Sequence, residues 1–161
     1  MPLEKLKEFL DSRNVRYAII SHSLAYTAAE IAALAHIPGK ELAKTVIVKI
    51  DSALAMAVVS ASQHVDLTFL KAMTAAKAVD LATEDEFKEK FSDCEVGAMP
   101  PFGNLYGMPV FADESLSRDK EILFNAGSHR ELARIAWVDF EKLVQPRVMR
   151  IASGKRADEA A

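Results

Sequence analysis

The sequence predicts a single α/β domain in which a mixed, mostly antiparallel sheet curls towards a barrel and is surrounded by helices. Its 161 residues fit one domain, and no repeat, linker or shift in composition divides them. Short β-rich runs alternate with segments of helical periodicity. Several of these runs follow one another through short turns, which antiparallel strands allow, whereas a doubly wound parallel sheet needs a crossover helix between successive strands.

The first elements are two helices with a strand between them. Apolar residues recur at helical spacing among charges over residues 3–13, which predicts an amphipathic helix. A strand is expected over 16–20. A second helix is expected over 28–37, because Thr27 and Glu30 form a capping-box pattern before it and a Pro-Gly pair ends it.

The middle of the chain predicts a hairpin and a second capped helix. The β-rich runs 44–50 and 53–60 are separated only by Asp51-Ser52. A helix over 66–75 and a short strand over 78–82 follow. The segment 83–91 then begins with another capping-box pattern, Thr83 and Glu86.

The last third contains two more predicted strands, 108–113 and 121–127, and a final helix. Segment 130–137 fits both a helix and a strand, and Asp139 is a candidate N-cap for the helix after it. The domain is expected over residues 1–152, and residues 153–161 are expected to form a flexible polar tail.

Composition excludes several classes of protein. The net charge of −3 argues against a general nucleic-acid binder, which would be basic. Cys94 is the only cysteine, so no internal disulfide can form. No apolar run reaches the roughly 20 residues that span a bilayer, and the charged N-terminal segment is not typical of a targeting peptide. We expect a cytoplasmic protein with no membrane contact.

No familiar catalytic signature is present, and no metal or other cofactor is expected. The sequence contains no nucleophile elbow, zincin motif, P-loop or dinucleotide fingerprint. The four histidines lie far apart without ligand spacing. They are His22, His36, His64 and His129.

Lys44 has two interpretations. It begins the apolar run "KTVIVKI", where a lysine is commonly a solvated residue that guards the end of a strand. Alternatively, its ammonium lies at the mouth of a cleft and binds a phosphate or a developing negative charge. Lys49 faces the other way in the same run and serves as the solvated reference.

The segment "FNAGSHREL" is a second candidate. Ser128 and Glu131 match a capping box, so a new element is expected to begin there, with His129 in its first turn. The imidazole of His129 either faces a neighbouring cleft or is an ordinary surface group.

The stretch "CEVGAMPPFGNLYGMPVF" is a third candidate, although it lacks an obvious nucleophile or base. Pro100 and Pro101 fix φ and remove two N–H groups. Gly97 and Gly103 permit a close backbone approach to a ligand. Either this is a rigid surface loop, or its backbone itself serves the chemistry.

Four segments taken in order resemble the YbaK/prolyl-tRNA synthetase-associated domain family. They are "HSLAYTAAEIA", "GKELAKTVIV", "GAMPPFG" and "FNAGSH", within a resemblance that runs from about residue 3 to 150. The family contains aminoacyl-tRNA deacylases that act in trans and the editing insertion domain of bacterial prolyl-tRNA synthetase.

The resemblance implies a role for each matching residue. Lys44 matches a lysine near the terminal adenosine and its phosphate, and Gly97 and Pro101 match the loop that lines the site of ester hydrolysis. The remaining matches are expected to contact the substrate or border its amino-acid pocket: Thr27, Glu30, Ile31, Leu34, Phe102, Gly127, Ser128 and His129.

The resemblance therefore implies a hydrolase that removes a small amino acid, such as Ala, Ser or Thr, from mischarged tRNA. Its partners would be the tRNA acceptor end and, transiently, a tRNA synthetase. A few cations would suffice to hold the CCA end: Lys40, Lys44, Arg130 and Arg134. The alternative is a module that binds a nucleotide or an RNA 3′ end without turnover. A hydrolase of free amino-acid esters or amides fits less well, because no nucleophile for an acyl-enzyme is evident.

Overall fold

The computed structural model describes residues 3–21 and 42–154. The α-helices of these residues are α1 (Glu4–Ser12), α3 (Leu67–Thr74), α4 (Glu84–Phe87) and α5 (Trp137–Val144). The strands are β1 (Tyr17–Ser21), β2 (Ala43–Ile50), β3 (Ala53–Ser60), β4 (His64–Val65), β5 (Val79–Leu81), β6 (Val110–Asp113), β7 (Glu121–Ser128), β8 (Glu131–Ala136), β9 (Arg147–Met149) and β10 (Ala152–Ser153).

The strands form a mixed, mostly antiparallel arrangement, as predicted. Within the described residues there are three sheets, ordered β1-β8-β7, β5-β2-β3-β6-β9 and β10-β4. Only β6 runs parallel to its neighbours, β3 and β9. A single parallel bridge, Leu42 to Leu123, joins the beginning of β2 to β7. The sheets curl towards each other at this point but do not close into a barrel.

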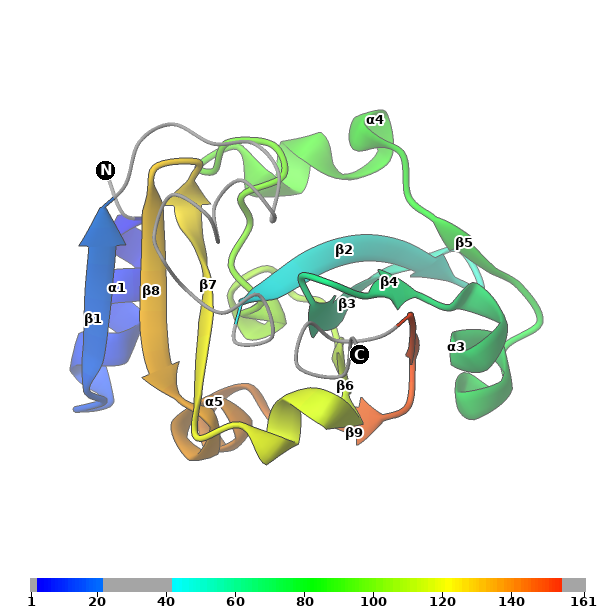
Figure 1. Ribbon diagram of the computed structural model, residues 1–161. Coiled ribbons are helices and arrows are strands. Elements are labelled where there is room, and N and C mark those ends of the chain that lie inside the picture. Colours follow the sequence, from blue (N-terminus) through cyan, green and yellow to red (C-terminus); the bar gives the residue numbers. More distant parts are fainter. Residues whose placement is uncertain (1–2, 22–41, 155–161) are drawn as a thin grey trace.

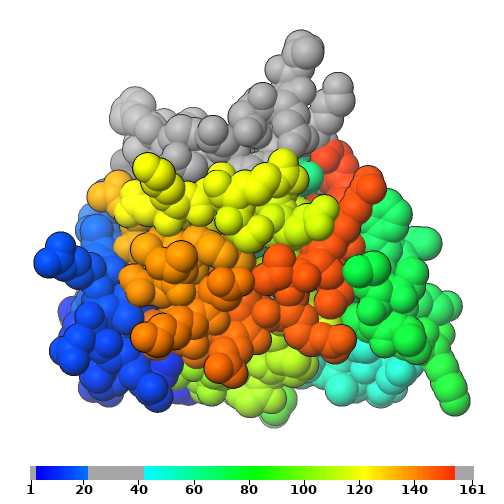
Figure 2. All heavy atoms as spheres, turned by 90° about the horizontal axis from the view of Figure 1, so that it is seen from below, coloured from blue at the N-terminus to red at the C-terminus, as the bar shows by residue number. Residues whose placement is uncertain are grey.

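Helices cover the sheets from several sides (Figure 1). In that view α1 lies behind the three-stranded sheet, α5 lies below it, and α3 lies at the far end beside β5. Seen from below, α5 and β9 form a continuous surface between β1 at one end and α3 at the other (Figure 2).

The five-stranded sheet separates two apolar clusters, because successive side chains of a strand point to opposite faces. Ile47 belongs to the larger cluster, which also contains Leu6 of α1 and Phe102. Val48, the next residue, belongs to the smaller cluster, with Leu70 of α3. Odd-numbered and even-numbered residues of β2 therefore face opposite sides of the five-stranded sheet.

The predicted β2-β3 hairpin is confirmed. Its register pairs Lys44 with Val59 and Ile50 with Ala53. The two turn residues, Asp51 and Ser52, have φ values of 49° and 73°. Positive φ at both positions is the geometry of a two-residue turn whose twist matches that of the flanking strands.

The capping box of α4 is also confirmed, with Thr83 and Glu86 in both of its hydrogen bonds. By contrast, Asp139 is not an N-cap: α5 begins at Trp137 after Ala136. Asp139 lies in the first turn, where its charge suits the helix dipole.

The ambiguous segment 130–137 is mostly strand β8, and no helix begins at Ser128. Pairing with β1 on one side and β7 on the other overrides its helical pattern. The predicted helix over 28–37 and most of the predicted tail lie outside the described residues. Within the described residues, no helix is both long and apolar enough to cross a membrane.

Candidate functional site

The loop that contains Gly97 is tied to the end of β7 by two backbone hydrogen bonds. The amide of Glu95 donates to the carbonyl of Gly127 (2.8 Å), and the amide of Gly127 donates to the carbonyl of Ala98 (3.0 Å). Gly97 lies between these anchors with φ of 84°. The structure thus brings together two segments that are about 30 positions apart in the chain.

His129 adds a third anchor from the β7-β8 turn. Its Nε2 lies 2.6 Å from the carbonyl oxygen of Val96. A carbonyl only accepts hydrogen bonds, so Nε2 carries a proton and donates. A Cβ on Gly97 would lie 3.4 Å from Cε1 of His129. The imidazole, 5% exposed, therefore packs under the loop and holds it.

Two amide groups at the tip of this loop are available to a ligand. In the described part of the chain, the N–H groups of Val96 and Gly97 make no hydrogen bond. Both residues are exposed. A loop fixed on both sides with free N–H donors at its tip can bind an anionic oxygen without reorganising.

Gly127 is required for this arrangement. Its φ is 95°, and a Cβ would lie 2.9 Å from Cβ of Leu3. The amide of Leu3 donates to the carbonyl of Ala126 (2.9 Å), which holds the two segments this close. A side chain at position 127 would push the N-terminal segment away from β7.

The rest of the Pro/Gly stretch is structural support. Pro101, Phe102 and Gly103 are buried. The ring of Phe102 packs against Phe124 and Phe140, with centroids 5.4 and 5.6 Å away, so it belongs to the core and acts on the site through the loop. Gly103 packs on the backbone of Met108, which leaves no room for a Cβ, so its close approach is to the chain itself and not to a ligand.

Lys44 lies in a small, mostly apolar cavity of about 180 Å³. Burial lowers its pKa below the ordinary value of 10.5. No carboxylate of the described residues lies within ion-pair distance of its ammonium. The other residues of this cavity are Val46, His64, Val65 and Leu81.

Gly97 lies in a neighbouring cavity of about 240 Å³. Thr45, Phe87 and Met99 also line it, and it shares Val46 and Leu81 with the cavity of Lys44. Val46 and Leu81 thus form an apolar ridge that has Lys44 on one side and Gly97 on the other. This ridge exists because β5 pairs with β2 only at Val48–Ile50, which leaves the first half of that β2 edge open.

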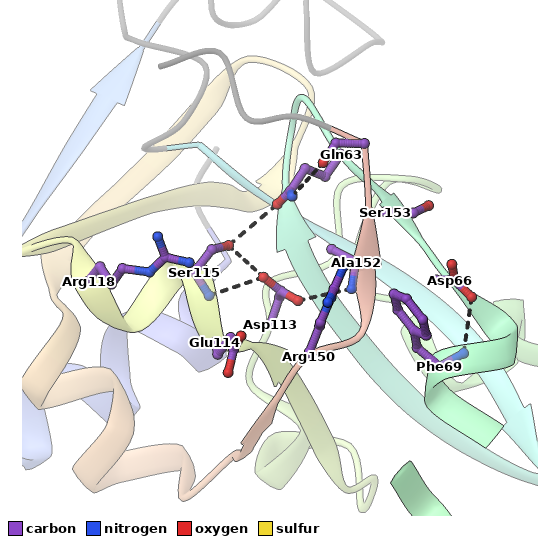
Figure 3. Close-up of a pocket in the computed structure, with 11 residues that line it drawn as sticks. Gln63, Asp66, Phe69, Asp113, Glu114, Ser115, Arg118, Arg150, Ala152 and Ser153 are labelled. Carbon is purple, nitrogen blue, oxygen red and sulfur yellow. Dashed lines mark hydrogen bonds between the residues drawn. The ribbon is translucent and has the colours of Figure 1, made fainter. Parts of the chain in front are cut away.

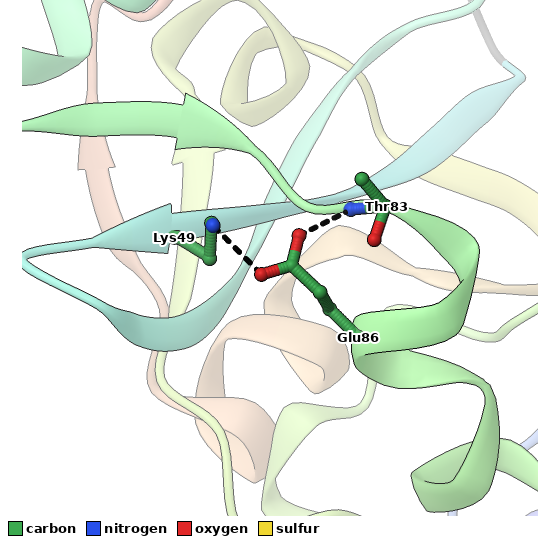
Figure 4. A network of polar contacts seen from close by, with 3 residues as sticks. All are labelled: Lys49, Thr83 and Glu86. Atoms are coloured by element: carbon green, nitrogen blue, oxygen red, sulfur yellow. Dashed lines mark hydrogen bonds and ion pairs between the residues drawn. The ribbon is translucent and has the colours of Figure 1, made fainter.

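Lys49 has a different environment from Lys44 (Figure 4). Its Nζ lies 2.7 Å from Oε2 of Glu86, and the other carboxylate oxygen accepts the amide of Thr83 (2.9 Å). These two hydrogen bonds lower the pKa of Glu86 to about 2, that from Lys49 contributing most. Lys49 is therefore an ion-paired structural residue and not simply a solvated one.

The environment of the half-buried Cys94 thiol does not favour the reactive thiolate. Burial raises its pKa to about 11, and its Sγ lies 3.2 Å from the hydroxyl of Tyr106. Ser128 is buried, and its hydroxyl donates to Glu131 (3.2 Å). Among the described residues, no group of three His, Cys, Asp or Glu side chains is placed to hold a metal ion.

The remaining predicted pocket residues, Thr27, Glu30, Ile31 and Leu34, lie outside the described residues, as does Lys40. Arg134 makes a long ion pair with Glu121 (3.8 Å) on the exposed side of the three-stranded sheet. The sequence reading missed the ridge residues Val46 and Leu81. The position of Val46, two residues after Lys44, could have indicated it, because residues two apart in a strand lie on the same face.

Comparison with protein families identifies the chain. A model of the aminoacyl-tRNA editing domain matches residues 22–143. The chain belongs to this family. The resemblance noted from its four sequence segments is therefore confirmed.

Relatives and solved structures agree with this assignment. Proline–tRNA ligases of Bacillus mycoides (strain KBAB4) and Bacillus cereus (strain AH187) are each 28% identical over 88 residues, which is 55% of this chain but only 15% of each ligase. A crystal structure of a candidate trans-editing enzyme for prolyl-tRNA synthetase has a TM-score of 0.80 at 21% identity, over 94% of this chain and 97% of that one. A hypothetical protein gives 0.83 at 20% identity, over 92% and 99%. At these identities the two structures show the fold.

Proposed function

We propose that this member of the editing family hydrolyses the ester of mischarged aminoacyl-tRNA in trans and removes a small amino acid such as Ala, Ser or Thr. The observation that carries the proposal is the loop of Gly97. It is anchored by Gly127 and His129, and its free N–H donors lie one ridge away from the half-buried ammonium of Lys44.

The chemistry needs no protein nucleophile. An aminoacyl ester is already activated, so hydrolysis requires a positioned water and a site that stabilises the developing oxyanion. One or both amides at the tip of the loop, Val96 and Gly97, would donate to that oxyanion, and one such donor typically contributes about 3–4 kcal/mol in the transition state. The half-buried thiol of Cys94 has a raised pKa and is not needed in this reaction.

Lys44 would bind the negative charge of the terminal nucleotide. Its ammonium is partly desolvated and has no carboxylate partner among the described residues, so a phosphate can restore the interactions that burial removed. The apolar ridge of Val46 and Leu81 would lie between the phosphate and the ester.

The amino-acid pocket is proposed between the segment of Thr27, Glu30, Ile31 and Leu34 and the β7-β8 turn. Such a pocket would admit a small side chain and exclude a larger one. Steric exclusion discriminates better than an apolar contact, because one methylene is worth only about 1–3 kcal/mol.

The test is a deacylation panel. Alanyl, seryl, threonyl and cysteinyl esters on tRNAs for Pro, Ala and Thr would be incubated with the protein in trans, with and without prolyl-tRNA synthetase. Release of one small amino acid well above the spontaneous rate is expected. If no ester is released and an uncharged CCA-ended tRNA still binds, the protein is a binding module without turnover.

A further inference from the structure

A further, polar cavity of about 330 Å³ is lined by the residues drawn in Figure 3. None of the residues predicted for ester hydrolysis lines it. It is formed by segments from three parts of the chain: Gln63, Asp66, Phe69, Asp113, Glu114, Ser115, Arg118, Arg150, Ala152, Ser153 and Gly154.

Asp113 is the fixed centre of the cavity floor. It is buried, and its Oδ1 accepts the amides of Ile151 and Ala152, each at 2.9 Å. Its Oδ2 accepts the amide (3.0 Å) and the hydroxyl (2.6 Å) of Ser115. Four donors thus satisfy the hydrogen-bonding capacity of this carboxylate, so it is fixed in place and shapes the floor of the cavity.

Gln63 forms a wall that is equally fixed. It is buried, its Nε2 donates to the carbonyl of Gly154 (2.9 Å), and its Oε1 lies 3.4 Å from the hydroxyl oxygen of Ser115, whose proton is directed to Asp113. Asp66 is also engaged, because its Oδ1 caps α3 by accepting the amide of Phe69 (3.0 Å).

The rim carries two exposed arginines on different segments, Arg118 and Arg150. The guanidinium carbon of Arg150 lies 4.7 Å from the ring centroid of Phe69, so the aromatic ring holds the guanidinium in place. An arginine held in this way presents a planar fork of donors that matches a phosphate. Glu114 is the exposed carboxylate of the rim.

The position of the cavity indicates which phosphates it would meet. His64 and Val65 line the cavity of Lys44, whereas the residues on either side of them, Gln63 and Asp66, line the polar cavity. Four residues of extended chain span at most about 14 Å. A short single strand that ends at Lys44 can therefore continue across β4 into the polar cavity.

We propose that the polar cavity binds the sugar-phosphate backbone of the nucleotides that precede the terminal adenosine of the tRNA 3′ end. This inference rests on the proposed function, which places the terminal nucleotide at Lys44. Arg150 and Arg118 contact phosphates, and the hydrogen-bonded floor of Asp113, Gln63 and Ser115 keeps the cavity open.

The experiment compares two substrates and two arginines. The substrates are a full-length aminoacyl-tRNA and the same amino acid esterified to adenosine alone. Arg147 provides a matched control for Arg150, because it also stacks on a phenylalanine, Phe111 at 5.3 Å, but lies outside the cavity. Arg150→Ala should raise KM for the tRNA roughly tenfold, leave kcat unchanged and leave the adenosine ester unaffected. Arg147→Ala should change neither substrate.

Salt dependence and the neutralisation of two other rim charges sharpen the test. Loss of one phosphate contact should reduce the slope of log KM against log salt by about one for Arg150→Ala. Arg118→Ala should act in the same direction, and Glu114→Gln should lower KM. Equal losses on both substrates, or equal effects of the Arg150 and Arg147 variants, would overturn the proposal.

Binding of an uncharged CCA-ended oligonucleotide, followed by fluorescence anisotropy, separates this inference from the proposed function. If the wild type hydrolyses neither substrate but binds the oligonucleotide through Arg150, the proposed function fails and the cavity assignment stands. If it hydrolyses both substrates and Arg150→Ala binds the oligonucleotide normally, only the cavity assignment fails.

Discussion

The two halves of β2 contrast most clearly in this molecule. Over Val48–Ile50 the strand pairs with β5, and Lys49 is held by Glu86 at 2.7 Å. Over Lys44–Val46 that edge has no strand partner in the described part of the chain, and two cavities lie beside it. Lys44 is partly desolvated there, and no carboxylate of residues 3–21 or 42–154 pairs with it.

The contrast shows that the neighbours of a lysine decide its role. Lys49 and Glu86 stabilise each other's charged forms, so the pKa of Lys49 is raised. Burial lowers the pKa of Lys44, so its charge costs folding free energy. A residue that is unfavourable for stability and faces a cavity is a candidate for function.

The largest expected effect is that of Lys44→Ala. It should reduce kcat/KM for deacylation about 100-fold, because a charge-assisted contact to the substrate is lost. The thermal midpoint of Lys44→Ala should stay close to that of the wild type. The thermal midpoint of Lys44→Met should equal or exceed that of the wild type, because the substitution removes a charge that burial disfavours. Deacylation rates and thermal unfolding would be measured in parallel.

Lys49→Ala is the control for this comparison and should leave turnover nearly unchanged. Activity should also decline as the pH rises through the lowered pKa of Lys44, earlier than for a solvated lysine. Turnover near the wild-type rate in Lys44→Ala would break the proposed contrast between the two lysines.

A second prediction separates backbone strain from function at the loop. Gly97 and Gly107 both have positive φ, 84° and 67°, but a Cβ on Gly107 would meet nothing within 4 Å. Alanine at either position should cost about 1 kcal/mol and lower the thermal midpoint by roughly 2–4 °C. Only Gly97→Ala should also reduce kcat, by about tenfold or more, because it displaces the amide donors. Equal activity of the two variants would exclude the loop from the chemistry.

Much of the fold could be predicted from local patterns. The Asp51-Ser52 hairpin and the Thr83–Glu86 capping box were both readable, because each depends on residues close together in the chain. Strand β8 could not be predicted in this way, because it is set by pairing with β1 and β7, which are distant in the chain or outside the periodicity of the segment itself. Asp139 was misassigned for a related reason: α5 begins directly where β8 ends.

In the candidate site, too, single residues could be predicted from the sequence, whereas their arrangement in space could not. Lys44 and Gly97 could be selected from the sequence, because a cation before an apolar strand and a Pro/Gly loop are local signals. Their separation by the ridge of Val46 and Leu81 depends on where β5 stops pairing, which no local pattern encodes. The hydrogen bond from His129 to Val96 likewise joins residues 33 positions apart.

A third, smaller effect concerns His129. Because its ring donates to the carbonyl of Val96, His129→Ala should loosen the loop and lower the rate for every ester by a similar factor, about three- to tenfold. His129→Gln offers an amide donor and should recover part of the loss. A changed ratio of seryl to alanyl ester hydrolysis would instead support the direct substrate contact predicted from the sequence.

The smallest effect is expected at the paired end of β2. The pKa of Glu86 in the folded protein is about 2, below its ordinary value of 4.5, so the protein gains stability from its ionised form. This gain is complete above pH 4.5 and is lost as the pH falls from 4.5 towards 2. Glu86→Gln should therefore lower the thermal midpoint at pH 7, by no more than about 3 °C because the pair is partly exposed to solvent. The difference from the wild type should shrink steadily as the pH falls through that window, whereas Lys44→Met should show no such dependence. A Glu86→Gln midpoint that stays equally far below the wild type down to pH 2 would show that the charge pair with Lys49 does not account for the loss, because glutamine can still accept the amide of Thr83.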